Sequence, residues 1–266
     1  MVRLQDQKST VRPDSLAAEE PLEIRIGGEA LTVTMRTPGD DFDLVAGFLV
    51  SEGLVARSED LRALRYCAGT DADGRNTYNV IDAALAGAAA VPVSLHRNLL
   101  TSSACGICGR ETIESIRGRV PHDLTADGLR TSAETLYGLP GTLRAAQKVF
   151  DSTGGLHAAG LFTADGTLLC LREDVGRHNA VDKVVGWALR EGRLPLRGHL
   201  LLVSGRASFE LTQKAAMAGL PLLAAVSAPS SLAVDLATDL GLTLVGFLRD
   251  RGANVYSAAE RITTAE

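Results

Sequence analysis

The chain has 266 residues, of which 45% are apolar and 22% are charged, and its formal net charge is −5 at pH 7. This length and apolar content can bury a sizeable core, which excludes an intrinsically disordered protein. The acidic balance disfavours a nucleic-acid-binding protein, because such proteins carry a basic surface. The first twenty residues lack the apolar centre of a signal peptide, and no apolar segment reaches the roughly 18 residues that cross a bilayer. We therefore expect a cytoplasmic protein without membrane insertion.

The N-terminal third predicts a solvated tail followed by a small α+β unit. Residues 1–19 are mostly polar, and we expect a disordered tail there. Apolar and polar residues alternate from Leu22 to Met35 around a pair of glycines, which is typical of a β-hairpin. An amphipathic stretch at Asp41–Glu52, followed by Gly53, predicts a helix and its end. Two further strands and a low-complexity linker are expected after it, at Leu61–Tyr66, Thr77–Ile81 and Ala83–Ala90.

From Leu139 onward, short apolar strands alternate with longer helical stretches. Strands are predicted at Leu156–Phe162, Thr167–Leu171, His199–Val203, Leu222–Val226 and Thr243–Phe247. Helices are predicted at Gly141–Asp151, Ala180–Glu191, Phe209–Ala218 and Ser231–Leu240. This alternation is typical of an α/β fold with a mostly parallel or mixed sheet and helices on both faces. The predicted organisation has four parts: a tail at 1–19, an N-terminal α+β subdomain at 20–97, a loop region with two cysteines at 98–130, and a C-terminal α/β domain at 131–266.

Three polar loops are predicted at the carboxyl ends of strands, where ligands collect in α/β sheets. Ser204–Ser208 and Ser227–Ser231 are rich in small residues that let backbone N–H groups approach an anion, and Glu173–Asn179 carries charges of both signs. The residues selected from these loops are Ser204, Gly205, Arg206, Ser227, Arg177 and His178. Each loop also has a simpler interpretation as a helix cap or an exposed ion pair. Together they favour a phosphate or nucleotide site, although the glycine motifs of dinucleotide-binding and P-loop proteins do not occur in the sequence.

Two cysteines, Cys105 and Cys108, are separated by two residues in a segment of small side chains. A structural zinc site would need a second pair, and Cys67 and Cys170 are too far apart in sequence to form one. A thioredoxin-like redox pair normally lies between a strand and a helix, whereas the residues around this pair predict a loop. A zinc deaminase needs an H-x-E motif, and His157 is not followed by a glutamate. The pattern favours a nucleophilic thiol that carries sulfur as a persulfide, with no metal bound by the protein; zinc and redox roles are less favoured alternatives.

Several segments resemble a known family when they are taken together. They are Ser103–Gly109, Gly154–Ala159, Glu173–Lys183 and Ser204–Glu210. They resemble the FdhD family of formate dehydrogenase accessory sulfurtransferases, and the similarity extends to Ala215–Asp235 and to the segment from Glu20 to Gly53. The resemblance covers nearly the whole chain from about Glu20.

The resemblance implies a sulfur carrier that accepts sulfur from a cysteine desulfurase and passes it to the molybdenum cofactor before that cofactor enters formate dehydrogenase. It implies that Cys105 carries the persulfide with Cys108 as its partner. The cofactor is then a bound client, molybdenum bis(molybdopterin guanine dinucleotide), held through its guanine nucleotide portions, so GDP is an expected ligand. The resemblance also implies a homodimer and a C-terminal part similar to the cytidine deaminase fold. The cofactor-binding segment that it implies comprises Phe247, Leu248, Arg249, Asp250, Arg251 and Gly252.

That last segment has a physical interpretation as well, because two arginines and a glycine after a strand can hold phosphate oxygens or guanine edges. The competing interpretation is an exposed charged turn before a short strand at Asn254–Ser257. A second function also stays open at this point. It is a non-catalytic chaperone that binds the cofactor and the apo-dehydrogenase, in which Cys105 and Cys108 have a structural or redox role.

Overall fold

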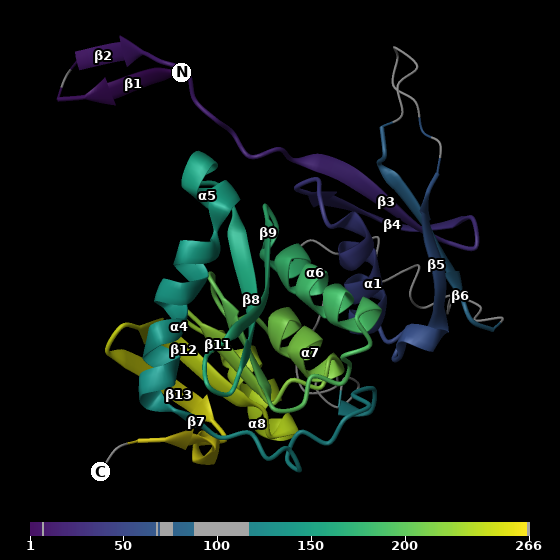
Figure 1. Cartoon of the computed structure of the whole chain (residues 1–266), viewed down its shortest axis with the longest axis vertical. Helices are drawn as coiled ribbons and strands as arrows, with labels where there is room; N and C mark the ends of the chain where they lie inside the picture. Colours follow the sequence, from purple (N-terminus) through teal and green to yellow (C-terminus); the bar gives the residue numbers. More distant parts are fainter. Residues whose placement is uncertain (7, 68, 70–76, 88–116, 265–266) are drawn as a thin grey trace.

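Two mixed β-sheets organise the chain (Figure 1). The computed structural model describes residues 1–6, 8–67, 69, 77–87 and 117–264. The N-terminal part holds a four-stranded sheet and the C-terminal part a six-stranded sheet, with helices packed around and between them. Within the described ranges, no helix is both long enough and apolar enough to span a bilayer.

The four-stranded sheet has the strand order β4-β3-β6-β5. Its strands are β3 (Glu20–Ile26), β4 (Glu29–Arg36), β5 (Leu61–Tyr66) and β6 (Val80–Leu85). The predicted hairpin is formed by β3 and β4, and its turn uses Gly27 and Gly28 at φ angles of 58° and 90°, which glycine adopts without strain. The face of β3 that carries Leu22 and Ile24 is buried in the core that also holds α1 (Asp41–Ser51).

The six-stranded sheet has the strand order β13-β12-β11-β10-β8-β9. The three central strands are parallel, and the outer strands pair antiparallel with their neighbours. The strands are β8 (His157–Thr163), β9 (Leu168–Asp174), β10 (His199–Val203), β11 (Leu222–Ala225), β12 (Thr243–Arg249) and β13 (Gly252–Ser257). Every residue of β11 is buried, as expected for a central strand covered on both faces. The predicted mixed sheet is confirmed.

Helices cover both faces of the six-stranded sheet, so the predicted α/β class is also confirmed (Figure 1). Helix α4 (Ala133–Ala146) buries three leucines against one face, in a cluster with Phe162 and Leu202. The other face is covered by α6 (Arg177–Arg190), α7 (Phe209–Met217) and α8 (Ser231–Leu240). The core on that side continues into the N-terminal sheet, so the two predicted units share one hydrophobic core.

Several boundaries differ from the sequence-based predictions. The helix predicted at Gly141–Asp151 spans parts of two helices, α4 and α5 (Lys148–Thr153), because the backbone leaves the helical conformation at Gln147, where ψ is 81°. Ser132 caps the start of α4 and accepts a hydrogen bond from Thr135 N. Strand β6 includes Ala83–Leu85, which the sequence predicts as part of a linker; all three residues pair with β5, and Ala83 also pairs with β3. The short pairs outside the main sheets are β7 (Thr131–Ser132) with β14 (Ile262–Thr263), and β1 (Val2–Gln5) with β2 (Lys8–Val11). The β1–β2 hairpin lies within the segment predicted as a disordered tail, and all its described strand residues are exposed.

Helices α1 and α6 cross at two glycines, and this crossing joins the N-terminal unit to the C-terminal domain. A Cβ atom built on Gly47 would lie 1.8 Å from the backbone oxygen of Asp182, and one built on Gly186 would lie 1.8 Å from the backbone oxygen of Asp43. No side chain fits at either position, because real Cβ atoms do not approach backbone oxygens so closely. The two helix backbones are therefore in direct contact.

Substitution Gly47→Ala is expected to lower the free energy of unfolding by about 3 kcal/mol or more, because the added methyl group forces the two helices apart. The control is Gly138→Ala in the exposed face of α4, where a Cβ atom meets nothing within 4 Å. This control should raise stability by up to about 1 kcal/mol through helix propensity. Chemical denaturation of both variants tests the expectation, and equal stabilities would contradict the helix contact.

Candidate functional site

The loops that follow the parallel strands lie side by side at the carboxyl edge of the six-stranded sheet. Ser227 N donates to the backbone oxygen of Gly205 at 3.3 Å, and Phe247 N donates to the backbone oxygen of Ser227 at 3.1 Å. Ser204 Oγ accepts a hydrogen bond of 2.9 Å from Ala158 N, which attaches the β10–α7 loop to β8. The structure thus brings together the predicted site residues of the loops after β10 and β11 and Phe247, which lies within β12.

The third predicted loop reaches the same edge. Strands β9 and β10 both run antiparallel to β8, so they end on the same side of the sheet. The loop is shorter than predicted: Asp174 ends β9, Gly176 is the N-cap residue of α6, and α6 begins at Arg177. A Cβ atom on Gly205 would lie 3.9 Å from Cδ of Arg177, so the start of α6 is in contact with the β10–α7 loop.

The start of α6 has two sides with different roles. On the inner side, Lys183 Nζ forms a 2.8 Å ion pair with Asp174, whose side chain is completely buried, and donates to the backbone oxygen of Thr37 at 2.9 Å. Asp174 also accepts hydrogen bonds from Thr37 N and from the side-chain nitrogen of Asn179. These residues of the Glu173–Lys183 segment attach α6 to the loop between β4 and α1, so they have a structural role.

The outer side of the same helix start faces the edge loops. His178 Nε2 forms a 2.8 Å contact with a carboxylate oxygen of Glu210 and lies 3.4 Å from Ser208 Oγ. Both partners belong to the loop after β10 or to the first turn of α7. Nε of Arg177 is buried and has no hydrogen-bond partner among the described residues. Buried polar atoms normally have a hydrogen-bond partner, so an unpaired Nε of Arg177 at this edge is consistent with a ligand site.

Two titratable groups at this edge were not among the residues selected from the sequence. Burial lowers the pKa of His157, with further contributions from Arg177 and His178, and the hydrogen bond from His178 lowers the pKa of Glu210. A Cβ atom on Gly205 would lie 3.5 Å from Nδ1 of His157. Groups with perturbed pKa values are common at functional sites, and His178 interacts with both of these groups. The available signal for His157 in the sequence is its place in Gly154–Ala159, one of the segments that resemble the family.

The segment from Phe247 to Gly252 is the end of a strand hairpin and not a loop between a strand and a helix. Strand β12 continues to Arg249, Asp250 and Arg251 form the turn, and β13 begins at Gly252. Phe247 lies in a strand irregularity with a φ angle of 51°, and the residue is 39% exposed. A bulky residue with positive φ is strained, which is common near functional sites.

The arginines of this segment, Arg249 and Arg251, are exposed, whereas Leu248 is completely buried in the cluster beneath α4. Its side chain is therefore not available to a ligand. Of the predicted segment, the exposed residues are the ones whose side chains can contact a cofactor.

The cysteines predicted to carry sulfur, Cys105 and Cys108, lie outside the described residues. Of the other two, Cys170 is buried in β9, and burial raises the pKa of its thiol to about 12. A thiol with such a pKa is almost entirely protonated at neutral pH and is a poor nucleophile. Cys67 follows β5 and is partly exposed. The described part of the chain contains no group of three or more His, Cys, Asp or Glu residues placed to hold a metal ion.

Comparison with known proteins decides the family. The model of the FdhD/NarQ family matches residues 17–263. The chain belongs to the FdhD/NarQ family. It is 61% identical over 262 residues to a protein named "Sulfur carrier protein FdhD" from Nocardia farcinica, covering 98% of this chain and 93% of that relative. It is 59% identical to the protein of the same name from Mycolicibacterium paratuberculosis, covering 96% and 94%.

A crystal structure titled as a putative formate dehydrogenase accessory protein from Desulfotalea psychrophila has the same fold. Its TM-score is 0.71 at 23% identity, and the match covers 99% of this chain and 97% of that one. The family resemblance predicted from the sequence motifs is confirmed.

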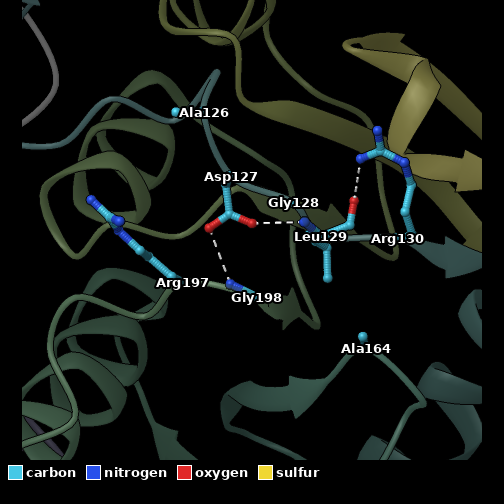
Figure 2. Close-up of a pocket in the computed structure, with 8 residues that line it drawn as sticks. All are labelled: Ala126, Asp127, Gly128, Leu129, Arg130, Ala164, Arg197 and Gly198. Atoms are coloured by element: carbon cyan, nitrogen blue, oxygen red, sulfur yellow. Dashed lines mark hydrogen bonds between the residues drawn. The ribbon is translucent and has the colours of Figure 1, made fainter.

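A separate cavity of this FdhD/NarQ family member lies at the opposite edge of the six-stranded sheet, where β8 ends and β10 begins (Figure 2). Its volume is about 600 Å³, and Asp127 accepts hydrogen bonds there from Leu129 N at 2.8 Å and from Gly198 N at 3.1 Å. Figure 2 shows the guanidinium groups of Arg130 and Arg197 pointing away from each other. Because the carboxylate is already bonded and the two cations diverge, we assign no ligand to this cavity.

The division of α6 into two sides predicts different effects on stability. Lys183→Met should lower the free energy of unfolding by about 3 kcal/mol, because it leaves the buried carboxylate of Asp174 without its counter-charge. Arg177→Ala, on the outer side of the helix start, should change stability by less than about 1 kcal/mol. Urea unfolding of both variants provides the measurement. A Lys183→Met protein as stable as the parent chain would rule out the structural role of the pair.

Proposed function

We propose that this chain is a sulfur carrier for formate dehydrogenase maturation. Cys105 accepts sulfur from a cysteine desulfurase as a persulfide and passes it to the molybdenum bis(molybdopterin guanine dinucleotide) cofactor, which is the cargo of the reaction. The observation that carries the proposal is the match, over 98% of the chain, to a relative named as a sulfur carrier. The predicted cytoplasmic location and homodimer stay predictions.

The environment of Cys170 supports Cys105 as the carrier, because it excludes Cys170 from that role. Cys170 is buried and its thiol has a pKa of about 12, so it is unsuited to attack. In the loading step, the Cys105 thiolate attacks the outer sulfur of the desulfurase persulfide. A new S–S bond forms, the S–S bond of the donor breaks, and the desulfurase thiolate leaves. We assign to Cys108, three positions further on in the sequence, the role of resolving or protecting the adduct.

The carboxyl edge of the six-stranded sheet is the proposed docking place for a guanine nucleotide portion of the cofactor. The N-termini of α6 and α7 open at this edge, and unpaired N–H groups at helix starts favour anions. Arg177 and Arg206 add guanidinium donors suited to diphosphate oxygens. Phe247 is exposed, and its backbone N–H donates to the backbone oxygen of Ser227 in the same group of loops, so its ring is suited to stacking on a base. The local positive charge explains how an acidic chain can hold an anionic client.

GDP binding tests the docking place. A ligand that binds only the folded state stabilises it, by about 2.7 kcal/mol at a concentration 100 times its Kd, so GDP should raise Tm. Arg206→Ala should raise the Kd for GDP about tenfold through loss of a charged hydrogen bond. Arg197→Ala, at the opposite edge of the sheet, is the matched control and should leave the Kd unchanged. No shift in Tm with GDP, or equal effects of the two variants, would contradict the site.

A Cys105→Ala variant tests the carrier role separately. We expect it to bind GDP normally and to abolish activation of formate dehydrogenase, because it lacks the thiol that we propose as the persulfide carrier. Cys67→Ala is the control and should retain activation. Mass spectrometry after incubation with a desulfurase and cysteine should show one added sulfur atom on Cys105 in the parent chain. Full activation by Cys105→Ala would instead support the non-catalytic chaperone.

A further inference from the structure

His157 occupies a junction of three elements at the proposed nucleotide site. It is the first residue of β8 and lies opposite Asp174, the last residue of β9, in the strand register. Its Nδ1 lies 3.5 Å from the point where a Cβ atom on Gly205 would be. Glycine at position 205 therefore places no side chain between Nδ1 of His157 and Cδ of Arg177, where the β10–α7 loop meets the start of α6.

The charges around His157 are unbalanced in favour of positive charge. From α6, Arg177 and His178 both lower its pKa, after the effect of burial. From β9, Asp174 acts in the opposite direction, but its carboxylate is already paired with Lys183 and hydrogen-bonded to Thr37 N. From α7, Glu210 is occupied by its contact with His178.

The neighbouring guanidinium group, that of Arg177, has a hydrogen-bond donor that can serve a ligand. Nε of Arg177 is buried and has no partner among the residues that the structure describes. A negative charge close to an imidazole favours its protonated form, whereas the surroundings of His157 in the ligand-free protein favour its neutral form. An incoming anion would thus satisfy Arg177 and remove the repulsion that keeps a proton away from His157.

We propose that His157 is a ligand-contacting residue of the nucleotide site and takes up a proton from solvent when a diphosphate group binds between it, Arg177 and the backbone at Gly205. This inference rests on the proposed docking of a guanine nucleotide at the carboxyl edge. The diphosphate accepts hydrogen bonds from Arg177 and from the protonated imidazole. The doubly protonated ring offers two N–H donors, whereas the neutral ring offers only one.

The sign of the pH dependence follows from this coupling. The pKa of His157 lies below its ordinary value in the free protein and rises when the anion binds. Below both pKa values the ring is protonated in either state, and above both it is neutral in either state. Between them, binding takes up a proton, so affinity for the diphosphate falls as pH rises through this window. The ordinary histidine pKa of about 6.5 lies in or near the window.

Calorimetric titration of GDP at pH near 6.5, in buffers of different ionisation enthalpy, counts the protons taken up on binding. The terminal phosphate of GDP titrates in the same range, so the readout is the difference between parent chain and variant. His157→Gln should remove on the order of half a proton of uptake. It should also weaken GDP binding about tenfold at pH 6 and much less at pH 8. His199→Gln, at the opposite edge of the sheet, is the matched control and should change neither quantity.

The possible outcomes separate this inference from the proposed function. If the parent chain does not bind GDP, the proposed docking place fails and the inference fails with it. If GDP binds but His157→Gln shows the parent proton count and pH profile, only the role of His157 is overturned. Loss of the proton uptake in His178→Gln but not in His157→Gln would assign the proton to His178 and overturn the inference as well. Should His157→Gln lower Tm without ligand, His157→Asn serves as the second variant under the same criteria.

Discussion

The buried ion pair between Asp174 and Lys183 holds the start of α6, and the candidate site is built on that start. The pair is sealed from solvent, and hydrogen bonds from Thr37 and Asn179 complete it, so the end of β9, the first turns of α6 and the β4–α1 loop are joined at one place. A buried charge pair is costly to disrupt by removing one partner. It therefore defines where Arg177 can lie relative to the loops after β10 and β11.

The N-terminal unit takes part in this arrangement as a support for the site. Direct backbone contact between α1 and α6 at Gly47 and Gly186 brings the four-stranded sheet onto the C-terminal domain, and the two share a core. A second buried ion pair, between Asp182 of α6 and Lys214 of α7, holds α7 against α6. The helices whose N-termini open at the carboxyl edge are thus held from below by charge pairs and close packing, which orients their N–H groups before any ligand arrives.

Local pattern was sufficient for most of the fold. The bounds of β5, β10 and α8 match the expected ranges, because alternation and helical periodicity are strong within those segments. It failed where pairing partners decide the outcome. The residues Ala83–Leu85 look like a linker in isolation, yet they are strand because all three pair with β5 and Ala83 also pairs with β3. The edge hairpin at Phe247–Gly252 also depends on pairing, between β12 and β13.

Sequence by itself determined the family, the α/β class and the loops that meet at the sheet edge, because motif spacing and periodicity are local properties of the chain. It could not divide the Glu173–Lys183 segment into a buried structural side, with Asp174 and Lys183, and an outer side, with Arg177 and His178. It also did not select His157 or exclude Leu248. Those distinctions depend on strand register and on which side of each element is buried, and only the packing of distant segments decides both.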